Sequence, residues 1–269
     1  MKKALKKIAH AVGLRRHHVA AARMYGERHL LATAKSARPS PIRSTGRILC
    51  YHSIGQRASG VNDVDPKRFC RQIELALHAG FRFVPPEQIA ATGGGPMDLA
   101  ITFDDGWTSV LSNAAPILRD YDVPWLLFVV TSWSDHRSDW TKQCILPWRD
   151  IDRLMALGAQ IASHSMTHPD FASIERAQMI DELSGSRDII QERLGFAPRA
   201  FAIPYGQSMN WTPMAGQIAR EAGYHTVYAQ AEETRPNGTI PRTFVTRFDG
   251  DRIFRALLQG AYDRWEEWF

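Results

Sequence analysis

Two adjacent carboxylates, Asp104 and Asp105, directly follow an apolar run of strand length at residues 99–103. Neighbouring acids repel each other, and a position near the core adds a desolvation cost, which a divalent cation usually offsets. Because adjacent side chains diverge, one carboxylate can bind the cation while the other stays free as a base. The pair therefore indicates metal-assisted acid–base chemistry, and the alternative is two ordinary acids in a turn that continues into Gly106.

Two histidines, His164 and His168, follow another strand-like run at residues 160–163. Imidazoles four residues apart can offer two nitrogen ligands to one ion, although the chain contains 10 histidines and chance pairs are therefore common. Together with Asp105 they make a set of two imidazoles and one carboxylate, with positions left for water and substrate. Such a site activates water for hydrolysis at neutral pH, with Asp104 as the general base.

A third candidate segment, Pro204-Tyr205-Gly206, follows the strand-like run at residues 200–203. Proline and glycine shape a tight turn, and the backbone N–H groups of such a turn can face an anion. By itself the segment predicts only a turn. In a parallel α/β fold, however, the active site lies at the carboxyl ends of the strands, so the three segments are expected to meet there.

Strand-like and helical patterns alternate along most of the chain. Apolar runs of strand length lie at residues 47–51, 81–84, 99–103, 125–130, 160–163, 200–203, 225–229 and 239–246. Helical patterns lie between them at residues 66–80, 109–121, 149–158, 173–195, 212–223 and 251–261. This alternation predicts an α/β fold with a parallel sheet, most economically seven or eight units closed into a barrel. A doubly wound open sheet is the alternative, but no glycine-rich phosphate loop follows the first strand.

The positive charge of the chain is concentrated at its N-terminus. The net charge is +5, yet residues 1–47 hold twelve Lys or Arg residues and a single acid, Glu27, whereas residues 48–269 are net acidic. We therefore divide the chain into a basic N-terminal arm with its linker, residues 1–47, and a folded body, residues 48–269. The basic isoelectric point of the chain comes from the arm and not from the body. It therefore gives no reason to expect that the body binds a nucleic acid. The 3 cysteines are too few and too scattered for a disulfide framework and are expected to be free thiols.

The arm places Leu5, Ile8, Ala9 and Val12 at helical spacing with lysines between them. Such a basic amphipathic pattern can lie on an anionic membrane surface, so residues 1–35 are a candidate for peripheral membrane contact. The alternative, which is the more common case for basic helical faces, is a solvated helix that packs on the body. Neither a secretory signal peptide nor a membrane span can be read from the sequence. These features predict a protein of the cytoplasm or of the inner face of the membrane.

The three segments, in this order and at these strand ends, resemble the motifs of the polysaccharide deacetylase family, which is also called the NodB-homology domain or carbohydrate esterase family 4. The resemblance runs from about residue 48 to about residue 258 and rests on the combination of Thr-Phe-Asp-Asp-Gly with His-Ser-x-x-His. It implies a distorted (β/α) barrel and a catalytic domain at residues 48–269. It also implies an enzyme that removes acetyl groups from sugar polymers such as chitin, peptidoglycan or poly-N-acetylglucosamine.

The resemblance also implies a role for each motif residue. Asp104 would be the catalytic base, and Asp105, His164 and His168 would bind the metal ion, most commonly Zn²⁺ and sometimes Co²⁺ or Ni²⁺. The backbone N–H of Tyr205 would help to stabilise the oxyanion of the tetrahedral intermediate. Loss of one such donor typically costs about 100- to 1000-fold in rate.

This sequence departs from the family pattern at the residue that holds the catalytic base. Many members carry an arginine in the third motif, where this chain has Phe-Ala-Ile at residues 201–203. Another group must therefore hold the base carboxylate. Arg242 and Arg247, on and just after the last predicted strand, are the candidates for orienting it.

A second departure concerns the general acid. The late Leu-x-His motif of the family is missing, and no histidine follows His225, which is expected to be structural. His52, which ends the first strand-like run, is the candidate substitute. A Tyr-His pair at this position resembles the branch of the family that acts on exopolysaccharides of the poly-N-acetylglucosamine type. The alternative is a structural histidine at a strand end.

Four residues near the strand ends are expected to contact the substrate. Trp107 and Trp133 would offer flat faces to sugar rings, although large aromatic residues in barrels more often serve packing. Pro204 and Gly206 would contribute through the turn of the third motif.

The sequence as a whole therefore predicts a metal-dependent deacetylase that hydrolyses acetamide groups of N-acetylated sugars in a polysaccharide or oligosaccharide. Its partner would be an N-acetylated carbohydrate and its cofactor a divalent metal ion. Two alternatives remain. The first is a deacetylase or deformylase of a lipid-linked or small sugar, and the second is a carbohydrate-binding relic of the same fold without catalytic activity.

Overall fold

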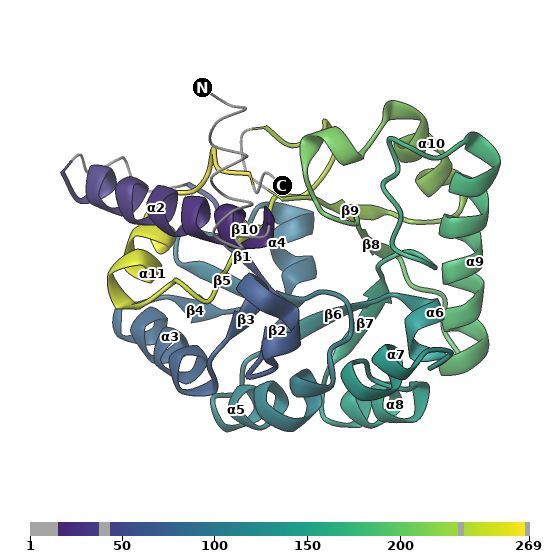
Figure 1. The fold of residues 1–269 in the computed structure, drawn as a ribbon, viewed down its shortest axis with the longest axis horizontal. Helices are drawn as coiled ribbons and strands as arrows, with labels where there is room; N and C mark the ends of the chain where they lie inside the picture. The colour runs from purple at the N-terminus through teal and green to yellow at the C-terminus, as the bar shows by residue number, and fades with distance from the viewer. Residues whose placement is uncertain (1–15, 38–43, 231–233, 267–269) are drawn as a thin grey trace, which may run out of the picture.

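The computed structural model describes residues 16–37, 44–230 and 234–266. Its centre is a parallel sheet in the order β10-β1-β5-β6-β7-β8-β9, with β4 paired to the start of β5 (Figure 1). The strands are β1 Arg47–Tyr51, β4 Arg82–Phe83, β5 Asp98–Phe103, β6 Trp125–Val129, β7 Gln160–Ser163, β8 Ala200–Ala202, β9 Thr226–Tyr228 and β10 Thr243–Phe244. A separate small sheet pairs β2 Ser53–Ile54 with β3 Asp63–Val64.

The two ends of the main sheet approach each other. β9 and β10 are its last strands, and an isolated parallel bridge joins Tyr228 of β9 to Ile240, just before β10. The sheet therefore curves into a distorted (β/α) barrel, which confirms the predicted fold class. The last strand is shorter than the predicted run at residues 239–246, because Pro241 has no N–H to donate to a ladder.

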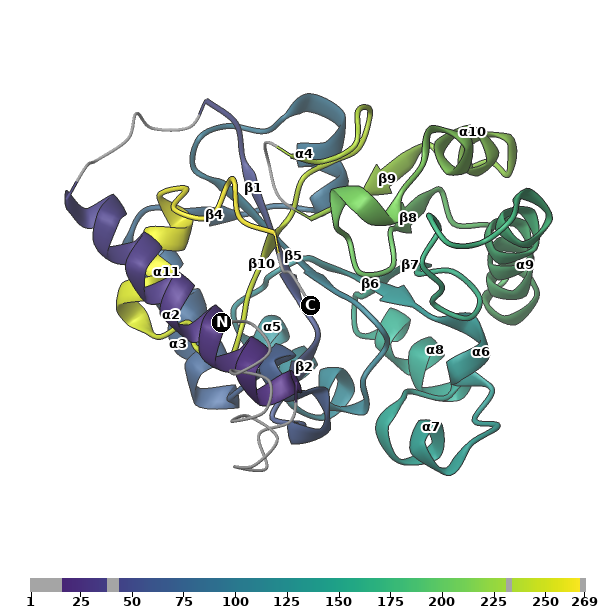
Figure 2. The ribbon, with the colours of Figure 1, turned by 45° about the horizontal axis from the view of Figure 1, so that its top comes forward.

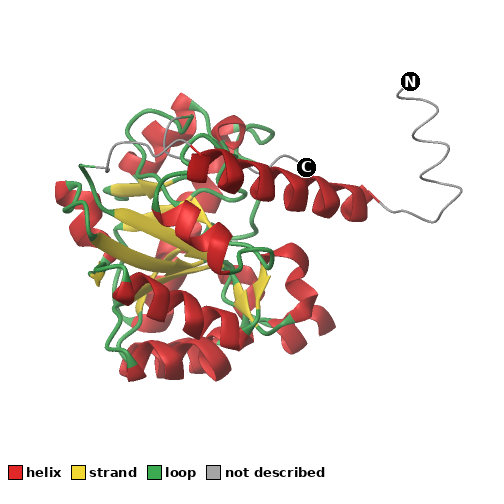
Figure 3. Cartoon of the chain, turned by 90° about the vertical axis from the view of Figure 1, so that its left-hand side faces the viewer, coloured by secondary structure: helices red, strands yellow, loops and turns green. Residues whose placement is uncertain are grey.

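Helices cover the outer side of the sheet (Figure 3). They are α2 Arg16–Ala37, α3 Pro66–His78, α4 Pro86–Thr92, α5 Ala115–Asp120, α6 Thr131–Ser134, α7 Asp139–Cys144, α8 Trp148–Ala156, α9 Arg176–Leu194, α10 Pro213–Glu221 and α11 Asp251–Leu258. Short 3-10 segments lie at η1 Arg57–Asn62 and η3 Ser208–Asn210. None of the helices in the described part of the chain has both the length and the apolar character needed to cross a membrane.

The predicted helix at residues 109–121 is divided in the structure. Its first part is a π-helical segment, η2 Val110–Ala114, and α5 begins only at Ala115. Pro116 lies in the first turn of α5 and has no N–H for the preceding turn, which explains why the regular α-helical ladder starts late.

The central strands form a rigid support for the segments that follow them. Every residue of β1, β5 and β6 is buried, as expected for parallel strands that lie between layers of side chains. Such strands have one firmly determined register, so the residues at their carboxyl ends have fixed positions relative to one another.

Helix α2 lies against α11 and is firmly attached to the body (Figure 2). Arg28 of α2 is fully buried, and its Nε donates to Asp249 Oδ1 at 2.5 Å. The guanidinium also lies over the ring of Tyr262, 4.2 Å from its centroid. The described part of the predicted arm therefore packs on the body. Residues 1–15, which carry the amphipathic pattern, lie outside the described residues.

Candidate active site

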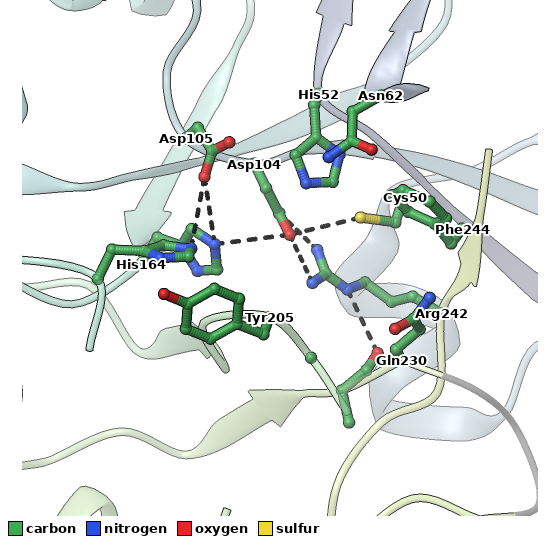
Figure 4. Close-up of a pocket in the computed structure, with 13 residues that line it drawn as sticks. Cys50, His52, Asn62, Asp104, Asp105, His164, Tyr205, Gln230, Arg242 and Phe244 are labelled. Carbon is green, nitrogen blue, oxygen red and sulfur yellow. Dashed lines mark hydrogen bonds and ion pairs between the residues drawn. The ribbon is translucent and has the colours of Figure 1, made fainter. Parts of the chain in front are cut away.

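The carboxyl ends of six strands, β1, β5, β7, β8, β9 and β10, border one cavity of about 200 Å³ (Figure 4). It is lined by residues from segments far apart in sequence, namely Cys50, His52, Asn62, Asp104, Asp105, His164, His168, Tyr205, Gly206, Ala229, Gln230, Arg242 and Phe244. The three predicted motif segments therefore meet, as the strand-end rule predicted. Of the other predicted site residues, His52 and Arg242 also line the cavity.

Three ligand atoms in this cavity are spaced for one metal ion. Oδ1 of Asp105 lies 3.6 Å from Nε2 of His164 and 3.7 Å from Nε2 of His168. The atoms that the three residues offer all lie within 4.8 Å of one another. Bonds of about 2.0–2.1 Å in a tetrahedral zinc site separate neighbouring ligand atoms by about 3.4 Å. The observed spacing is therefore close to that of a mononuclear site.

In both His164 and Asp105, one polar side-chain atom is hydrogen-bonded to the protein and the other is left to face a metal ion. Nδ1 of His164 contacts the carbonyl of Ala202 at 2.9 Å, so this nitrogen is the donor and Nε2 keeps its lone pair. Nε1 of Trp107 donates to Oδ2 of Asp105 at 3.0 Å. The other oxygen of Asp105, Oδ1, is buried and has no hydrogen-bond partner among the described residues. An orphaned carboxylate oxygen beside two imidazoles fits a divalent cation.

His168 is placed by its loop and by an aromatic neighbour. Its backbone N–H donates to Ser165 Oγ at 2.8 Å. Its ring stacks on Trp133 with the ring centroids 5.3 Å apart. Burial, with a contribution from His164, lowers the pKa of His168 to about 4. The imidazole is therefore neutral at neutral pH, which is the state that can bind a metal ion.

A buried acid of α9 holds the loop that carries the two histidines. Oε2 of Glu182 accepts the backbone N–H groups of Met166 and Thr167, each at 2.8 Å. Oε1 of the same carboxylate accepts the hydroxyl of Thr167 at 2.5 Å. Glu182 thus fixes the backbone of Met166 and Thr167. The spacing between His164 and His168 is therefore set by the way the loop packs on α9, and not only by the rotamers of the two histidines.

The site segments contain strained backbone. Positive φ angles are adopted by Asp105 (73°), Ser165 (71°), His168 (65°) and Tyr205 (64°). They are four of the six non-glycine residues with positive φ in the described chain. Such a conformation costs roughly 1–3 kcal/mol per residue and persists where the surrounding structure enforces it, most often at functional sites.

Arg242 holds the carboxylate of Asp104. Its Nη1 donates to Oδ1 at 2.6 Å and its Nη2 to Oδ2 at 2.8 Å, so both oxygens are engaged. Both side chains are buried. Burial alone would raise the pKa of Asp104, but the charges of Arg242 and His164 together with these hydrogen bonds hold that pKa well below its usual range. Asp104 is therefore ionised at any pH at which the protein would work.

Of the two candidate arginines, Arg242 thus contacts the carboxylate of Asp104, and Arg247 lies elsewhere. Arg247 is exposed, and its backbone N–H donates to Val61 O at 2.9 Å. Its side chain lines a separate surface hollow together with Arg57 and Arg68. The sequence could not distinguish the two arginines, because which one faces the cavity depends on how the chain bends after Pro241.

His52 lies in the wall of the cavity beside Asn62 (Figure 4). Its ring meets Phe244 edge-on, with the centroids 5.3 Å apart. Its Nδ1 is buried without a hydrogen-bond partner among the described residues. Burial lowers the pKa of His52, although the carboxylates of Asp105 and Asp104 oppose this effect. His52 is therefore available to exchange a proton with a molecule in the cavity.

The third motif forms the predicted tight turn at the edge of the cavity. Pro204 is buried, whereas the side chain of Tyr205 is half exposed. The carbonyl of Gly206 accepts the backbone N–H of Gln230 at 2.6 Å, which ties the turn to the strand end after β9. The rings of Tyr205 and His168 lie edge to face with centroids 4.7 Å apart, so the turn borders the metal-binding residues directly.

The predicted sugar platforms lie next to the metal-binding residues and do not line the cavity. Trp107 is only 6% exposed and is hydrogen-bonded to Asp105, so it has no free face for a sugar ring, contrary to the prediction. Trp133 is half-buried and stacked on His168. Trp140 is 42% exposed and meets both indoles edge-on. The two predicted tryptophans therefore position the groups that would bind the metal.

Sequence reasoning missed three polar residues of the cavity. Cys50 donates its thiol to Asp104 Oδ2 at 3.4 Å, and burial raises the pKa of that thiol, so it stays protonated. Gln230 follows β9, and the strand-end rule applied to that strand could have found it. Asn62 is the last residue of η1, directly before β3, and no pattern in the sequence indicates it.

Comparison with known proteins identifies the family. The family model described as polysaccharide deacetylase matches residues 93–227, half of the chain. The chain belongs to the polysaccharide deacetylase family. It is 29% identical over 136 residues to a chitooligosaccharide deacetylase of Bradyrhizobium sp., covering 50% of this chain and 56% of that protein. It is 27% identical over 108 residues to a chitin deacetylase of Colletotrichum lindemuthianum, covering 40% of this chain and 41% of that protein. The chain thus spans about half the length of these relatives.

Solved structures of the same fold cover most of this polysaccharide deacetylase chain. The Streptococcus pyogenes deacetylase PplD, in complex with acetate, superposes with a TM-score of 0.67 at 22% identity and covers 79% of this chain and 96% of its own. IcaB from Ammonifex degensii superposes with a TM-score of 0.66 at 24% identity and covers 81% and 97%. At these identities the superpositions show a shared fold.

Proposed function

We propose that this protein is a metal-dependent deacetylase that hydrolyses the acetamide groups of N-acetylated sugars in polysaccharide or oligosaccharide chains. One observation carries the proposal. Asp105, His164 and His168 are spaced for a metal ion, and Asp104, held by Arg242 and not part of that set, lies beside them in the same cavity. A carbohydrate-binding relic would have no use for a base held in this way.

The metal-binding set would hold a divalent ion, for which we propose Zn²⁺, with Co²⁺ or Ni²⁺ as alternatives. When bound, such an ion polarises a carbonyl oxygen and makes water easier to deprotonate. The two imidazoles are suited to this task because His164 has its tautomer fixed by Ala202 and His168 is kept neutral by its pKa of about 4.

Asp104 would accept the proton of the attacking water. Its Oδ2 lies 3.8 Å from Nε2 of His164, so the base borders the position where water would be activated. Arg242 orients both carboxylate oxygens and keeps them ionised. The role of Arg242 is thus to position Asp104, and its own guanidinium is not expected to touch the substrate.

Tyr205 and His52 would act on the two sides of the acetyl group. The backbone N–H of Tyr205, in its strained turn, would donate to the oxygen that becomes negative when water adds to the carbonyl carbon. His52 would give a proton to the amine nitrogen as the carbon–nitrogen bond breaks, so that acetate and a free amine leave. His52 must be protonated to do so, and the carboxylates of Asp105 and Asp104 favour the protonated form, although burial lowers its pKa.

The size of the cavity limits the substrate to a small group. At about 200 Å³ it is smaller than the about 300 Å³ at which drug-sized sites begin, so it suits one acetylated sugar unit with the rest of a chain outside. The site residues run from Cys50 to Phe244. We therefore propose residues 48–269 as the catalytic domain and residues 1–47 as an N-terminal arm with its linker.

The direct test is acetate release from chitooligosaccharides by the purified full chain. We expect release in the presence of Zn²⁺ or Co²⁺, loss of release after treatment with a chelator, and recovery when the ion is added back. The proposal fails if acetate appears at the same rate with and without chelator, or if no N-acetylated oligosaccharide is deacetylated by metal-loaded protein.

A further inference from the structure

Gln230 has no task in the reaction proposed above, yet its side chain lines the cavity. The residue is only 6% exposed. Neither Oε1 nor Nε2 of its amide has a hydrogen-bond partner within residues 16–37, 44–230 and 234–266. A buried primary amide without partners is costly, and native proteins rarely keep one unless a ligand or another polar group completes it.

The backbone fixes Gln230 at this position independently of its amide. Its N–H donates to the carbonyl of Gly206 at 2.6 Å. A Cβ placed on Gly206 would lie 3.1 Å from Cβ of Gln230, so the two segments are in close contact. The amide is therefore held in the cavity wall next to the Tyr205 turn, and its own hydrogen-bonding capacity remains unused.

A second carboxamide lies in the same cavity. Oδ1 of Asn62 is buried, lines the cavity and has no partner among the described residues. Figure 4 shows Asn62 beside His52 and Gln230 beside Arg242. Between them, Arg242 is committed to Asp104 through both of its Nη atoms. Besides His52 and the metal-binding Asp105, the unpartnered side-chain atoms among the described residues that line the cavity thus belong to two neutral amides.

We propose that Gln230, together with Asn62, forms a neutral subsite that binds hydroxyl groups of the sugar ring carrying the acetamide. This inference rests on the proposed deacetylase function and adds the group that the enzyme recognises. A hydroxyl both donates and accepts, and the Gln230 amide offers one group of each kind. A site built to hydrogen-bond a hydroxyl discriminates strongly against substrates that lack it, because its own buried polar atoms then stay unpaired.

The test compares a sugar substrate with an acetyl compound that has no sugar. We would measure kcat/KM of the metal-loaded full chain for an N-acetylated chitooligosaccharide and for 4-nitrophenyl acetate. In the Gln230→Ala variant, the ratio of the first value to the second should fall by about tenfold or more, which corresponds to one lost buried hydrogen bond. Gln230→Met keeps the side-chain volume without the amide and should lower the ratio equally.

The matched control is Gln217→Ala, which removes an exposed glutamine on α10 that donates to Glu221. Thermal melting of each variant verifies that it is folded. If either Gln230 variant fails to fold, Asn62→Ala takes its place in the same comparison and should also lower the ratio. The subsite is ruled out if the ratio stays within about twofold of the wild type, or if both substrates lose activity equally.

Calorimetric titration of the oligosaccharide into metal-loaded protein separates this inference from the proposed function. Wild-type protein that binds the sugar without releasing acetate contradicts the deacetylase proposal, and the dissociation constants of the Gln230 variants then decide the subsite. We expect those constants to rise by about tenfold. Wild-type protein that neither binds nor deacetylates the sugar overturns both proposals.

Discussion

At the scale of single residues, two neighbouring aspartates have different surroundings. Asp105 forms no ion pair with an arginine of the described residues, and its Oδ1 lies 3.6 Å and 3.7 Å from the Nε2 atoms of two histidines. Asp104 has both oxygens bound by Arg242 and one of them also by Cys50. A strand end directs adjacent side chains to different sides, so a single dipeptide can supply both a metal ligand and a base.

This division of work predicts different results for two substitutions. Asp104→Asn should lower kcat for acetate release by about 100- to 10,000-fold, the usual contribution of a general base, while bound metal stays near the wild-type amount. His164→Ala should lower the bound metal itself. Metal content by mass spectrometry and acetate release would be measured on the same samples. Loss of metal from Asp104→Asn would show that the two aspartates have been assigned the wrong way round.

The role of His52 leads to a prediction that depends on the leaving group. His52→Ala should lower acetate release from chitooligosaccharides by about 100-fold, because the amine must be protonated as it leaves. Hydrolysis of 4-nitrophenyl acetate should fall much less, since nitrophenolate leaves without a proton. Rates for both substrates provide the comparison. An equal loss for both, or near-full activity on the sugar, would remove His52 from the proton transfer.

At the scale of elements, the described part of the N-terminal arm is joined to the body by a buried ion pair. Arg28 of α2 and Asp249, just before α11, are both fully buried. Asp249 also accepts from the backbone N–H and the hydroxyl of Thr246, so it organises the segment between β10 and α11. The helix therefore stabilises the segment that follows the strand next to Arg242.

This contact predicts a large effect from one arginine and a small effect from another on the same helix. Arg28→Met leaves Asp249 buried and without its cation, and should lower the free energy of unfolding by about 3–5 kcal/mol. Arg23→Ala removes an exposed pair with Glu27 and should change it by less than about 1 kcal/mol. Urea denaturation of both variants gives the values. Similar small losses for both would mean that α2 is only loosely attached.

At the scale of the whole molecule, the metal-binding residues connect distant parts of the barrel. Asp105 follows β5, whereas His164 and His168 follow β7, and their alignment depends on the sheet between them. An ion bound by all three would stabilise the folded chain only, because an unfolded chain cannot present them together. The predicted membrane contact of residues 1–35 stays a prediction at this scale, since residues 1–15 lie outside the described part.

Metal binding should therefore be visible as stability. With free Zn²⁺ at 100 times its dissociation constant, the free energy of unfolding should rise by about 2.7 kcal/mol over the chelated protein. The His168→Ala variant should show little of this gain. Thermal melting with chelator, and then with added Zn²⁺, measures the difference. A melting temperature that changes neither with chelator nor with added Zn²⁺ would contradict a metal site in this cavity.

The barrel, and the three motif segments that meet at its strand ends, could be predicted from the sequence alone. The alternation of apolar runs and helical patterns predicted the parallel sheet, because burial on both faces leaves continuous apolar segments. Asp104 with Asp105, His164 with His168, and the turn at residues 204–206 lie in short continuous segments directly after strands. Their convergence followed from the general rule that parallel strands end at one edge.

Which distant side chains join these segments in the cavity could be seen only from the folded chain. Arg242 and Asp104 are 138 positions apart, and nothing local distinguishes Arg242 from Arg247. Likewise, the burial of Trp107, the unpartnered amide of Gln230 and the docking of Arg28 depend on what the closed barrel places beside them. Periodicity shows which residues are buried, whereas the partner of a buried polar group is set by packing between segments that the sequence pattern does not connect.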